Sequence, residues 1–306
     1  MQDDRLVGQD MKGIIQHSVR FLEPCRSLKS RGKRNEQAVS EAIGFIIIFG
    51  IIIAGIGLVT LYGYPMLLQQ QTNADEQIME KNLIVLQNDV KSLAYKTVPY
   101  KETSLKVGSG SLFVYNMTNT PTSAFMIYSE NGDPGTCITK DDGSTCYSVS
   151  DPLKFNPGDL RYESTSAQTG MSLENGAVVK RMLAENGSTM LAAPRWFYDS
   201  TSRTGVIYLI GFNTTDVMSR AGVGTVKMEL DQTKTNSTPY TTTGNQVCVK
   251  YDPNTNADYS TAWNNYFQNT LGTNSGSSGC SSGYYPFPAA MEKLVITKYE
   301  IVVKSV

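Results

Sequence analysis

The sequence from Ala42 to Leu61 reads AIGFIIIFGIIIAGIGLVTL, and every residue in it is apolar except Thr60. A helix of about 20 such residues spans the ~30 Å hydrocarbon core of a bilayer. No charged residue occurs from Ala42 through Ala74. A buried core helix would normally carry a polar stripe, which this segment lacks. The segment therefore predicts a membrane-crossing helix near the N-terminus.

The charges on either side of this segment predict its orientation. Positive flanks stay on the cytoplasmic side of a membrane, so the chain after the apolar segment is expected outside the cell. An ordinary secretory signal is the alternative, but its apolar region is about 7–15 residues long and ends at a small-x-small cleavage site. This segment is longer and no such site follows it, so we expect it to be retained. Basic residues precede it and acidic residues follow it, namely Arg26, Lys29, Arg31, Lys33 and Arg34, then Asp75, Glu76 and Glu80.

The residues that lead into the apolar segment carry a family resemblance. Lys33 to Gly44 reads KRNEQAVSEAIG and resembles the N-terminus of archaeal type IV pilin-like proteins, whose common core is A-V-S-x-x-I-G. The resemblance implies a prepilin peptidase that removes a leader of residues 1–36 and leaves the helix in place. Cleavage of the Glu36–Gln37 bond makes Glu41 the fifth residue, where type IV pilins have an acidic residue. The neighbouring Gln37–Ala38 bond is the alternative.

Glu41 has two interpretations. An unpaired carboxylate is costly in hydrocarbon or in a filament core, and the new α-amino group of Gln37 on a neighbouring subunit is a suitable partner. This interpretation makes Glu41 an assembly residue and predicts self-association through the N-terminal helices. Alternatively, Glu41 lies at the level of the lipid headgroups and Ser40 helps to start the helix.

The helix is expected to continue beyond the membrane, over residues 37–104 in all. The sequence Tyr62–Pro65 predicts an aromatic belt followed by a kink or a short break. Further on, apolar residues recur at alternating spacings of four and three, which predicts a seam on an otherwise polar helix. We expect the chain's own β-domain to cover this seam, which consists of Met79, Leu83, Leu86, Val90 and Leu93.

Residues 105–306 predict a β-rich domain. Short β-rich runs alternate with Gly, Asn, Asp, Ser and Pro, and turns are expected at Gly170, Asn175–Gly176, Asn186–Gly187 and Gly222. Together with the helix this gives an α+β fold with an all-β, sandwich-like extracellular domain. Residues 231–290 are rich in Ser, Thr, Asn and Gly and are expected to form a loop-dominated insertion. The predicted strands are 112–115, 125–128, 160–163, 177–181, 206–212, 225–230, 246–251 and 294–303.

The cysteines agree with an extracellular domain. Cys25 lies in the predicted leader, so the mature chain keeps an even number of cysteines, which favours disulfides in an exported protein. Short loops favour Cys137 with Cys146 and Cys248 with Cys280. A Cys₄ zinc site is the rival, but the sequence has no C-x-x-C pair.

Two other surface features are candidates for modification or binding. Acceptor motifs for N-glycosylation begin at Asn116, Asn186, Asn213 and Asn236, as expected of a surface glycoprotein. Oxygen ligands alternate at Asp252, Asn254, Asn256 and Asp258, as in a calcium loop. Pro253, Ala257 and Trp263 depart from that pattern, so an Asx-rich turn is favoured and no metal is assigned.

The aromatic groups Trp196–Tyr198 and Tyr284–Pro288 are interpreted as core and loop anchors rather than as sugar-stacking or subunit-contact surfaces.

Composition excludes several classes of function. The formal net charge is −1 and 18% of residues are charged, which does not suggest a nucleic-acid partner. The only histidine, His17, lies in the predicted leader, so the mature chain has no imidazole for a nucleophile pair or a metal centre. No acid–base pair or phosphate loop has convincing spacing, so we expect neither an enzyme nor a cofactor.

Two functions remain. The first is a major or minor structural subunit of an archaeal type IV pilus-like surface filament, with a prepilin peptidase and a pilus assembly platform as partners. The second is a permanently membrane-anchored, pilin-like adhesin or binding module that does not polymerise, with surface glycans as candidate ligands. Both place the chain in the cell membrane with an extracellular C-terminal domain. The first also places it in an extracellular filament.

Overall fold

The computed structural model describes residues 34–306 except 97, 119–122, 131–134, 142, 144, 217, 255, 270 and 272–278, and it describes side chains from Ser40 onward. The chain divides into two compact units, Met1–Gly63 and Tyr64–Val306. The predicted leader, residues 1–36, lies outside the described residues except for its last three.

The described part of the first unit is helical. Helix α1 covers Arg34–Leu58 and is followed by a π-helical turn, η1, at Val59–Gly63. The irregular turn ends two residues before Pro65, whose ring nitrogen has no hydrogen to donate to a carbonyl in the preceding turn. Such π-turns are a common cause of local irregularity in long helices. The predicted kink or break is therefore present as a π-turn.

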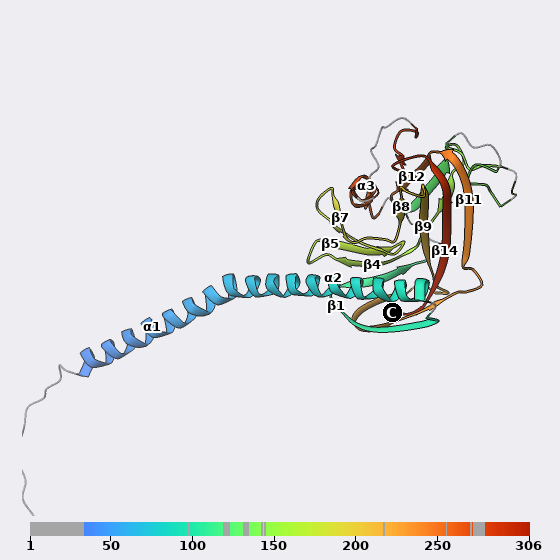
Figure 1. Ribbon diagram of the computed structural model, residues 1–306. Helices are drawn as coiled ribbons and strands as arrows, with labels where there is room; N and C mark the ends of the chain where they lie inside the picture. Colours follow the sequence, from blue (N-terminus) through green and yellow to red (C-terminus); the bar gives the residue numbers. More distant parts are fainter. Residues whose placement is uncertain are drawn as a thin grey trace, which may run out of the picture. The chain divides into compact units, whose positions relative to one another are not determined.

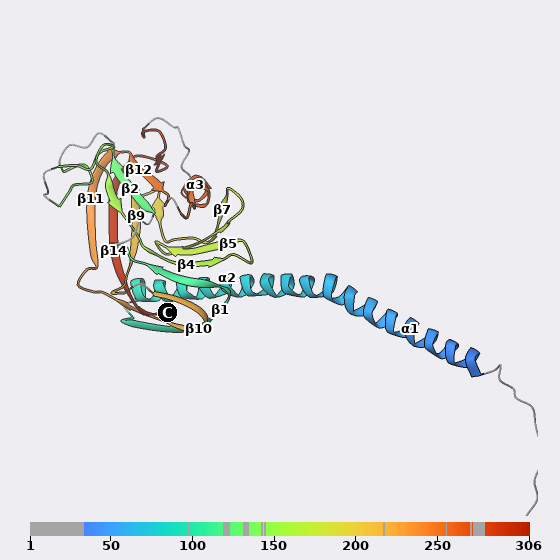
Figure 2. The ribbon, with the colours of Figure 1, turned by 180° about the vertical axis from the view of Figure 1, so that it is seen from behind.

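The second unit begins with helix α2, Tyr64–Lys96, which contributes one layer of a core. Its predicted apolar seam is fully buried and packs on strands of the large sheet. In Figure 1 and Figure 2, α2 lies alongside β1, the strand to which it makes its most extensive contact. The expectation that the β-domain covers the seam is confirmed.

The large sheet contains ten strands and is antiparallel except where β14 and β9 pair in parallel. The pairing of β14 with β9 keeps the end of the chain in the interior of the sheet. On the other side of β14, its first half pairs with β11 and its second half with β10. In sheet order the strands are β7 (Ser188–Ala192), β6 (Ala177–Met182), β5 (Thr169–Glu174), β4 (Asp159–Ser164), β1 (Tyr100–Tyr115), β10 (Met218–Leu230), β14 (Met291–Ser305), β9 (Thr204–Asn213) and β8 (Phe197–Asp199), with β11 (Asn236–Asn245) beside β14.

A second, four-stranded sheet and helix α3 (Ser260–Asn269) complete the domain. They enclose an aromatic core in which Trp263 of α3 lies 4.6 Å, centroid to centroid, from Phe125 and 6.2 Å from Trp196. The large edge-to-face rings bury much apolar area in a small volume, which stabilises the contact between the two sheets. The strands of this sheet are, in order, β13 (Tyr285–Pro286), β12 (Val247–Asp252), β2 (Ala124–Ser129) and β3 (Leu153–Phe155).

The α+β class is confirmed, since a long apolar helix precedes a mostly β domain in two sheets. Seven of the eight predicted runs lie wholly in a strand, and the run 246–251 lies in β12 except for its first residue, Gln246. The domain is not purely β, because it contains α3. Residues 231–290 also differ from the expectation of a loop-dominated insertion, because they contain β11, β12, α3 and β13. β11 is polar because most of its residues are exposed while its backbone pairs with β14.

The expected turns have mixed outcomes. Asn175 and Gly176 form the tight β5–β6 hairpin, with φ of 46° and 71°, which suits the Asn-Gly preference of such turns. Asn186–Gly187 lies in the connection between β6 and β7. Gly170 and Gly222 were wrongly expected as turns, because they lie inside β5 and β10. At Gly222 the φ of 77° coincides with an irregularity in the pairing of β1 with β10.

Candidate functional site

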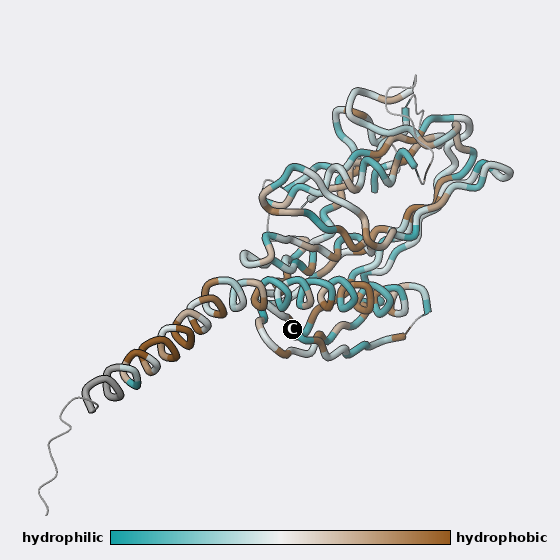
Figure 3. Tube along the Cα trace, turned by 90° about the vertical axis from the view of Figure 1, so that its left-hand side faces the viewer, coloured by the Kyte–Doolittle hydropathy of each residue, from teal (hydrophilic) through white to brown (hydrophobic). Residues whose placement is uncertain are grey.

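The apolar segment is the most distinctive candidate site in the chain. Among the described residues, one helical run, Ser40–Lys96, is long and apolar enough to cross a membrane, and its most apolar window has a mean hydropathy of 2.9 with no residue buried in the protein. Phe45, Ile46 and Ile51 of α1 are 66–69% exposed. Figure 3 shows the predominantly hydrophobic colouring of α1. This much apolar surface is unfavourable in water and is typical of a helix that crosses a membrane or packs against other apolar helices.

The predicted processing and assembly residues lie at the start of α1. The Glu36–Gln37 bond falls in the first turn of the helix, at residues whose side chains are not described. Glu41 is exposed and lies immediately before the apolar run. Its carboxylate is therefore available to a partner outside the described chain. Cleavage and pairing remain predictions.

Polar contacts fix α2 in the β-domain from Glu76 onward. The side-chain amide of Gln87 donates to the carbonyl oxygens of Gly176, at 2.7 Å, and Ala193, at 3.0 Å. The ammonium of Lys180 on β6 lies 2.7 Å from a carboxylate oxygen of Glu76 and 2.6 Å from one of Glu80. Gln87 is 2% exposed and Gly176 is buried, so the hydrogen bond between them satisfies two groups that are shielded from water, whereas Ala193 is exposed. These contacts hold α2 against the β5–β6 hairpin and the end of β7.

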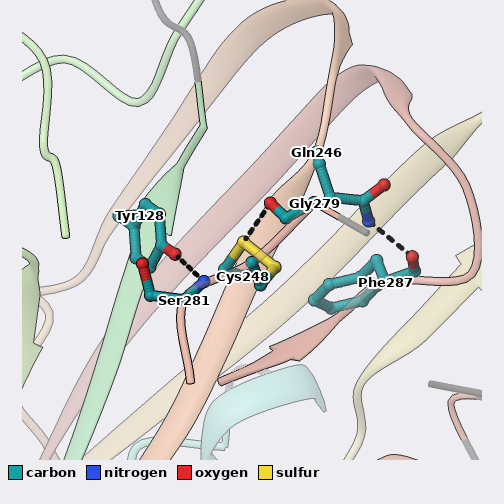
Figure 4. The surroundings of a disulfide bond; sticks show 7 residues. Tyr128, Gln246, Cys248, Gly279, Ser281 and Phe287 are labelled. Carbon is teal, nitrogen blue, oxygen red and sulfur yellow. Dashed lines mark hydrogen bonds between the residues drawn. A yellow bond between two sulfur atoms is a disulfide. The ribbon is translucent and has the colours of Figure 1, made fainter. Parts of the chain in front are cut away.

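Two disulfides staple the domain, in the pairing that the sequence favours. Cys137 pairs with Cys146 and Cys248 pairs with Cys280, each with a Cα–Cα distance of 5.9 Å. The second bridge ties β12 to the segment before β13. Around it, the backbone N–H of Ser281 donates to the Tyr128 hydroxyl at 2.9 Å, and the Gln246 amide donates to the carbonyl of Phe287 at 2.6 Å (Figure 4). These disulfides agree with an oxidising, extracellular environment.

The four acceptor asparagines differ in accessibility. Asn186 and Asn236 are exposed, so glycosylation there remains a prediction. Asn116 is 8% exposed, and its side-chain nitrogen donates to the side-chain oxygen of Asn213 at 2.9 Å and to the carbonyl of Thr214 at 2.7 Å. The nitrogen of Asn213 in turn donates to Glu300 at 2.5 Å. The folded domain therefore disfavours a glycan at Asn116 and at Asn213.

The calcium candidate is an Asx turn in the structure. The side-chain oxygen of Asn254 accepts the backbone N–H of Asn256 at 2.9 Å. Asp258 accepts the backbone N–H of Ser260 at 2.7 Å and so caps the start of α3. Asp252 ends β12. The oxygens of Asn254 and Asp258 are thus engaged by the backbone, and among the described residues no group of three or more His, Cys, Asp or Glu could hold a metal ion.

The expected aromatic anchors are mostly in the core. Trp196, Tyr284, Tyr285 and Phe287 are each less than 10% exposed, which favours the core interpretation over a surface for sugars. Phe197 differs, with 44% of its surface exposed, because it lies on the edge strand β8.

The sequence analysis missed a buried carboxylate, Glu174, at the end of β5. Its oxygens accept hydrogen bonds from Trp263 at 2.6 Å, Ser123 at 2.6 Å and Tyr251 at 3.0 Å. Burial, and then the negative charge of Asp159, raise the pKa of Glu174 to about 7, although the three hydrogen bonds act in the opposite direction. Because Glu174 is 2% exposed, it is closed to substrates and serves to join β5 to β12 and α3.

Asp159 belongs to a neighbouring buried ion pair. Arg161 donates to Asp159 at 2.8 Å, and Ser172 donates to the same carboxylate at 2.8 Å. The guanidinium of Arg161 also lies 4.4 Å from the centroid of the Tyr115 ring. Such a pair is costly to bury but strongly destabilising to break. Asp159 and Arg161 lie two residues apart on β4, so they share one face of the strand, and Ser172 joins them from the neighbouring strand β5.

One family model matches the chain over residues 37–304 and is described as a family of unknown function (DUF7289). The chain belongs to this family. No curated protein and no solved structure matches it. The DUF7289 match begins at residue 37, the first residue after the predicted leader. In this DUF7289 chain, a long apolar helix precedes the β-domain, an architecture consistent with that of pilin-like proteins, and the family description assigns no activity.

Proposed function

We propose that this DUF7289 chain is a subunit, major or minor, of an archaeal type IV pilus-like surface filament. The observation that carries the proposal is a difference in burial between the two helices. α1 exposes apolar side chains, whereas the apolar seam of α2 is buried against the β-domain. A subunit of this kind keeps a folded head while its apolar helix exchanges one apolar environment for another. The proposal assigns the chain no catalytic activity and no cofactor.

The apolar helix α1 suits the chain both before and after assembly into a filament. Before assembly, α1 lies in the cell membrane with its N-terminus in the cytoplasm and the β-domain outside. During assembly, a prepilin peptidase cuts the Glu36–Gln37 bond, and an assembly platform packs the helices of many copies together. The start of the family match at residue 37 supports this cleavage position, because the shared sequence excludes the leader.

A fixed membrane anchor is the second candidate. The same exposed apolar residues favour it, since α1 is long enough to remain in the bilayer. In that case the β-domain is a monomeric adhesin or binding module at the cell surface. The two functions differ in whether the chain leaves the membrane.

Shearing of cells that express the full chain separates the two functions. The filament proposal predicts that the chain is released with surface filaments, which an antibody to the β-domain labels along their length or at their tips in electron microscopy. A fixed anchor predicts that the chain stays with the membrane fraction.

Two variants show whether absence of the chain from the sheared fraction results from failed membrane insertion. Phe49→Asp places a charge in the middle of the apolar run and should abolish both membrane insertion and release. Val85→Asp makes the same kind of change at an exposed position of α2 and should leave release intact. The filament proposal fails if the wild-type chain is absent from the sheared fraction although the membrane contains it in the same amount as the Val85→Asp variant.

A further inference from the structure

A pocket of about 610 Å³ lies at the C-terminal end of α2. Three tyrosines from three elements line it: Tyr95 of α2, Tyr208 of β9 and Tyr299 of β14. The centroid of the Tyr95 ring lies 5.0 Å from that of Tyr208 and 5.7 Å from that of Tyr299. The Tyr208 and Tyr299 centroids are 6.1 Å apart. The rings are only partly buried, so they remain partly open to a ligand.

Positive charge is concentrated at this pocket. Arg195 comes from the β7–β8 connection, is exposed, and holds its guanidinium 4.8 Å from the Tyr95 ring centroid and 5.7 Å from that of Tyr208. Lys91 lies one turn before Tyr95 on the same face of α2. Burial, and then the charge of Arg195, lower the pKa of Lys91. Lys91 does not itself line the pocket, so Arg195 is the cation that a ligand bound there would meet.

This charge is not compensated within the described part of the chain. No ion pair there joins Lys91 or Arg195 to a carboxylate, and the described residues that line the pocket include no Asp or Glu. An anion bound beside Arg195 would pair with its guanidinium. Gln232 and Thr235, from the β10–β11 connection, add neutral groups that both donate and accept hydrogen bonds.

Each group suits one part of a particular kind of ligand. The faces of aromatic rings carry partial negative charge, so they attract the weakly positive C–H groups of a sugar ring. A guanidinium binds a carboxylate through paired hydrogen bonds. An amide and a hydroxyl match the alternating donors and acceptors of sugar hydroxyl groups.

We propose that this pocket binds an acidic saccharide, meaning a pyranose unit that carries a carboxylate, such as a uronic acid. The carboxylate lies at Arg195, the ring stacks on the tyrosines, and Gln232 and Thr235 contact hydroxyl groups. The proposal does not depend on filament assembly, because every residue in it belongs to the β-domain and to the packed half of α2.

Calorimetric titration of the full chain in detergent micelles tests the proposal with three probes of matched length. Tetragalacturonic acid is expected to bind, whereas maltotetraose, which is neutral, is expected to bind at least tenfold more weakly. Tetraglutamate carries the same number of side-chain carboxylates without a sugar ring and is also expected to bind at least tenfold more weakly. Equal binding of tetraglutamate would overturn the saccharide assignment in favour of an acidic peptide, and no binding of tetragalacturonic acid would overturn the site.

Variants locate the binding within the chain. Arg195→Gln should weaken tetragalacturonate binding at least tenfold without unfolding, because Arg195 is exposed. Lys293→Gln removes an exposed charge about 20 Å along β14 from Tyr299 and should leave binding unchanged. Equal losses in the two variants would show attraction by bulk charge and overturn the site.

The tyrosine ring is tested separately. Tyr299→Phe keeps the ring and should retain binding, whereas Tyr299→Leu removes it and should weaken binding by a similar factor to Arg195→Gln. Thermal unfolding of both variants shows whether the domain remains folded. Undiminished binding by a folded Tyr299→Leu variant would contradict the stacking role of the ring.

Discussion

Glu174 is a carboxyl group in a place that water does not reach, and its protonation links pH to the stability of the domain. Burial and the charge of Asp159 raise its pKa to about 7, from an ordinary value of 4.5. Between these values the unfolded chain has released the proton while the folded chain still holds it. The free energy of unfolding therefore falls as pH rises from about 4.5 to 7.

Glu174→Gln should remove this pH dependence. The amide oxygen can still accept hydrogen bonds from Trp263 and Tyr251, and no charge forms above pH 7. Relative to wild type, the free energy of unfolding of the variant should rise by roughly 3 kcal/mol between pH 4.5 and 8, at about 1.36 kcal/mol per pKa unit. Denaturant unfolding at both pH values measures this change. Glu185→Gln alters an exposed carboxylate and should follow wild type at both. A pH profile of Glu174→Gln parallel to that of wild type would contradict the account.

Glu41 tests the assembly proposal at a single carboxylate. Glu41→Gln keeps the size of the side chain and removes the charge that would pair with the α-amino group of Gln37. Filaments should be lost or shortened in electron micrographs of sheared material. Membrane insertion and leader cleavage should stay intact, because the apolar run and basic flank are unchanged. Normal filaments from this variant would remove the pairing role.

The packing of helix α2 on the β-domain depends on the buried side chain of Gln87. Gln87→Leu leaves the buried carbonyl of Gly176 without its donor and should lower the free energy of unfolding by about 1–3 kcal/mol. Asn88→Leu makes a comparable change at the next, exposed residue and should cost less than about 0.5 kcal/mol. Chemical denaturation compares the two. Equal costs would show that the buried hydrogen bonds do not stabilise α2.

The two disulfides should differ in their contribution to stability. Cys248–Cys280 closes a loop with a sequence separation of 32 residues, against 9 for Cys137–Cys146. A longer loop loses more entropy on closure. Removing Cys248–Cys280 by paired Cys→Ser substitutions should therefore lower the free energy of unfolding by about 3–4 kcal/mol, and removing Cys137–Cys146 should lower it by about 2–3 kcal/mol. Denaturant unfolding of the two double variants measures the order. The reverse order would contradict the loop-entropy explanation.

Sequence periodicity predicts those elements whose own residues carry the burial pattern. The seam of α2 and the apolar strand β9 were predictable, because their side chains are buried. β11 was not, since its side chains are largely exposed and its partner β14 fixes its strand conformation. α3 was missed because its short sequence is rich in polar residues and buries only four side chains, among them Trp263. Glu174 gave no signal, since its partners Ser123, Tyr251 and Trp263 are distant in sequence.

At the scale of the whole molecule, the two units have opposite relations to water. The described part of the first unit exposes apolar side chains along α1, whereas the second unit folds around two apolar cores and two disulfides. This arrangement favours an apolar environment for the first unit and an aqueous, oxidising environment for the second. A membrane supplies both, and so does a filament with a core of packed helices.

Helical reconstruction by electron cryo-microscopy of filaments sheared from cells tests the filament proposal most directly. The account predicts a central bundle of α1 helices surrounded by β-domains, with density that begins at Gln37 and places its amino group beside Glu41 of a neighbouring subunit. The filament proposal would be contradicted if the density of the filaments did not fit this sequence and the chain remained in the membrane of the same cells.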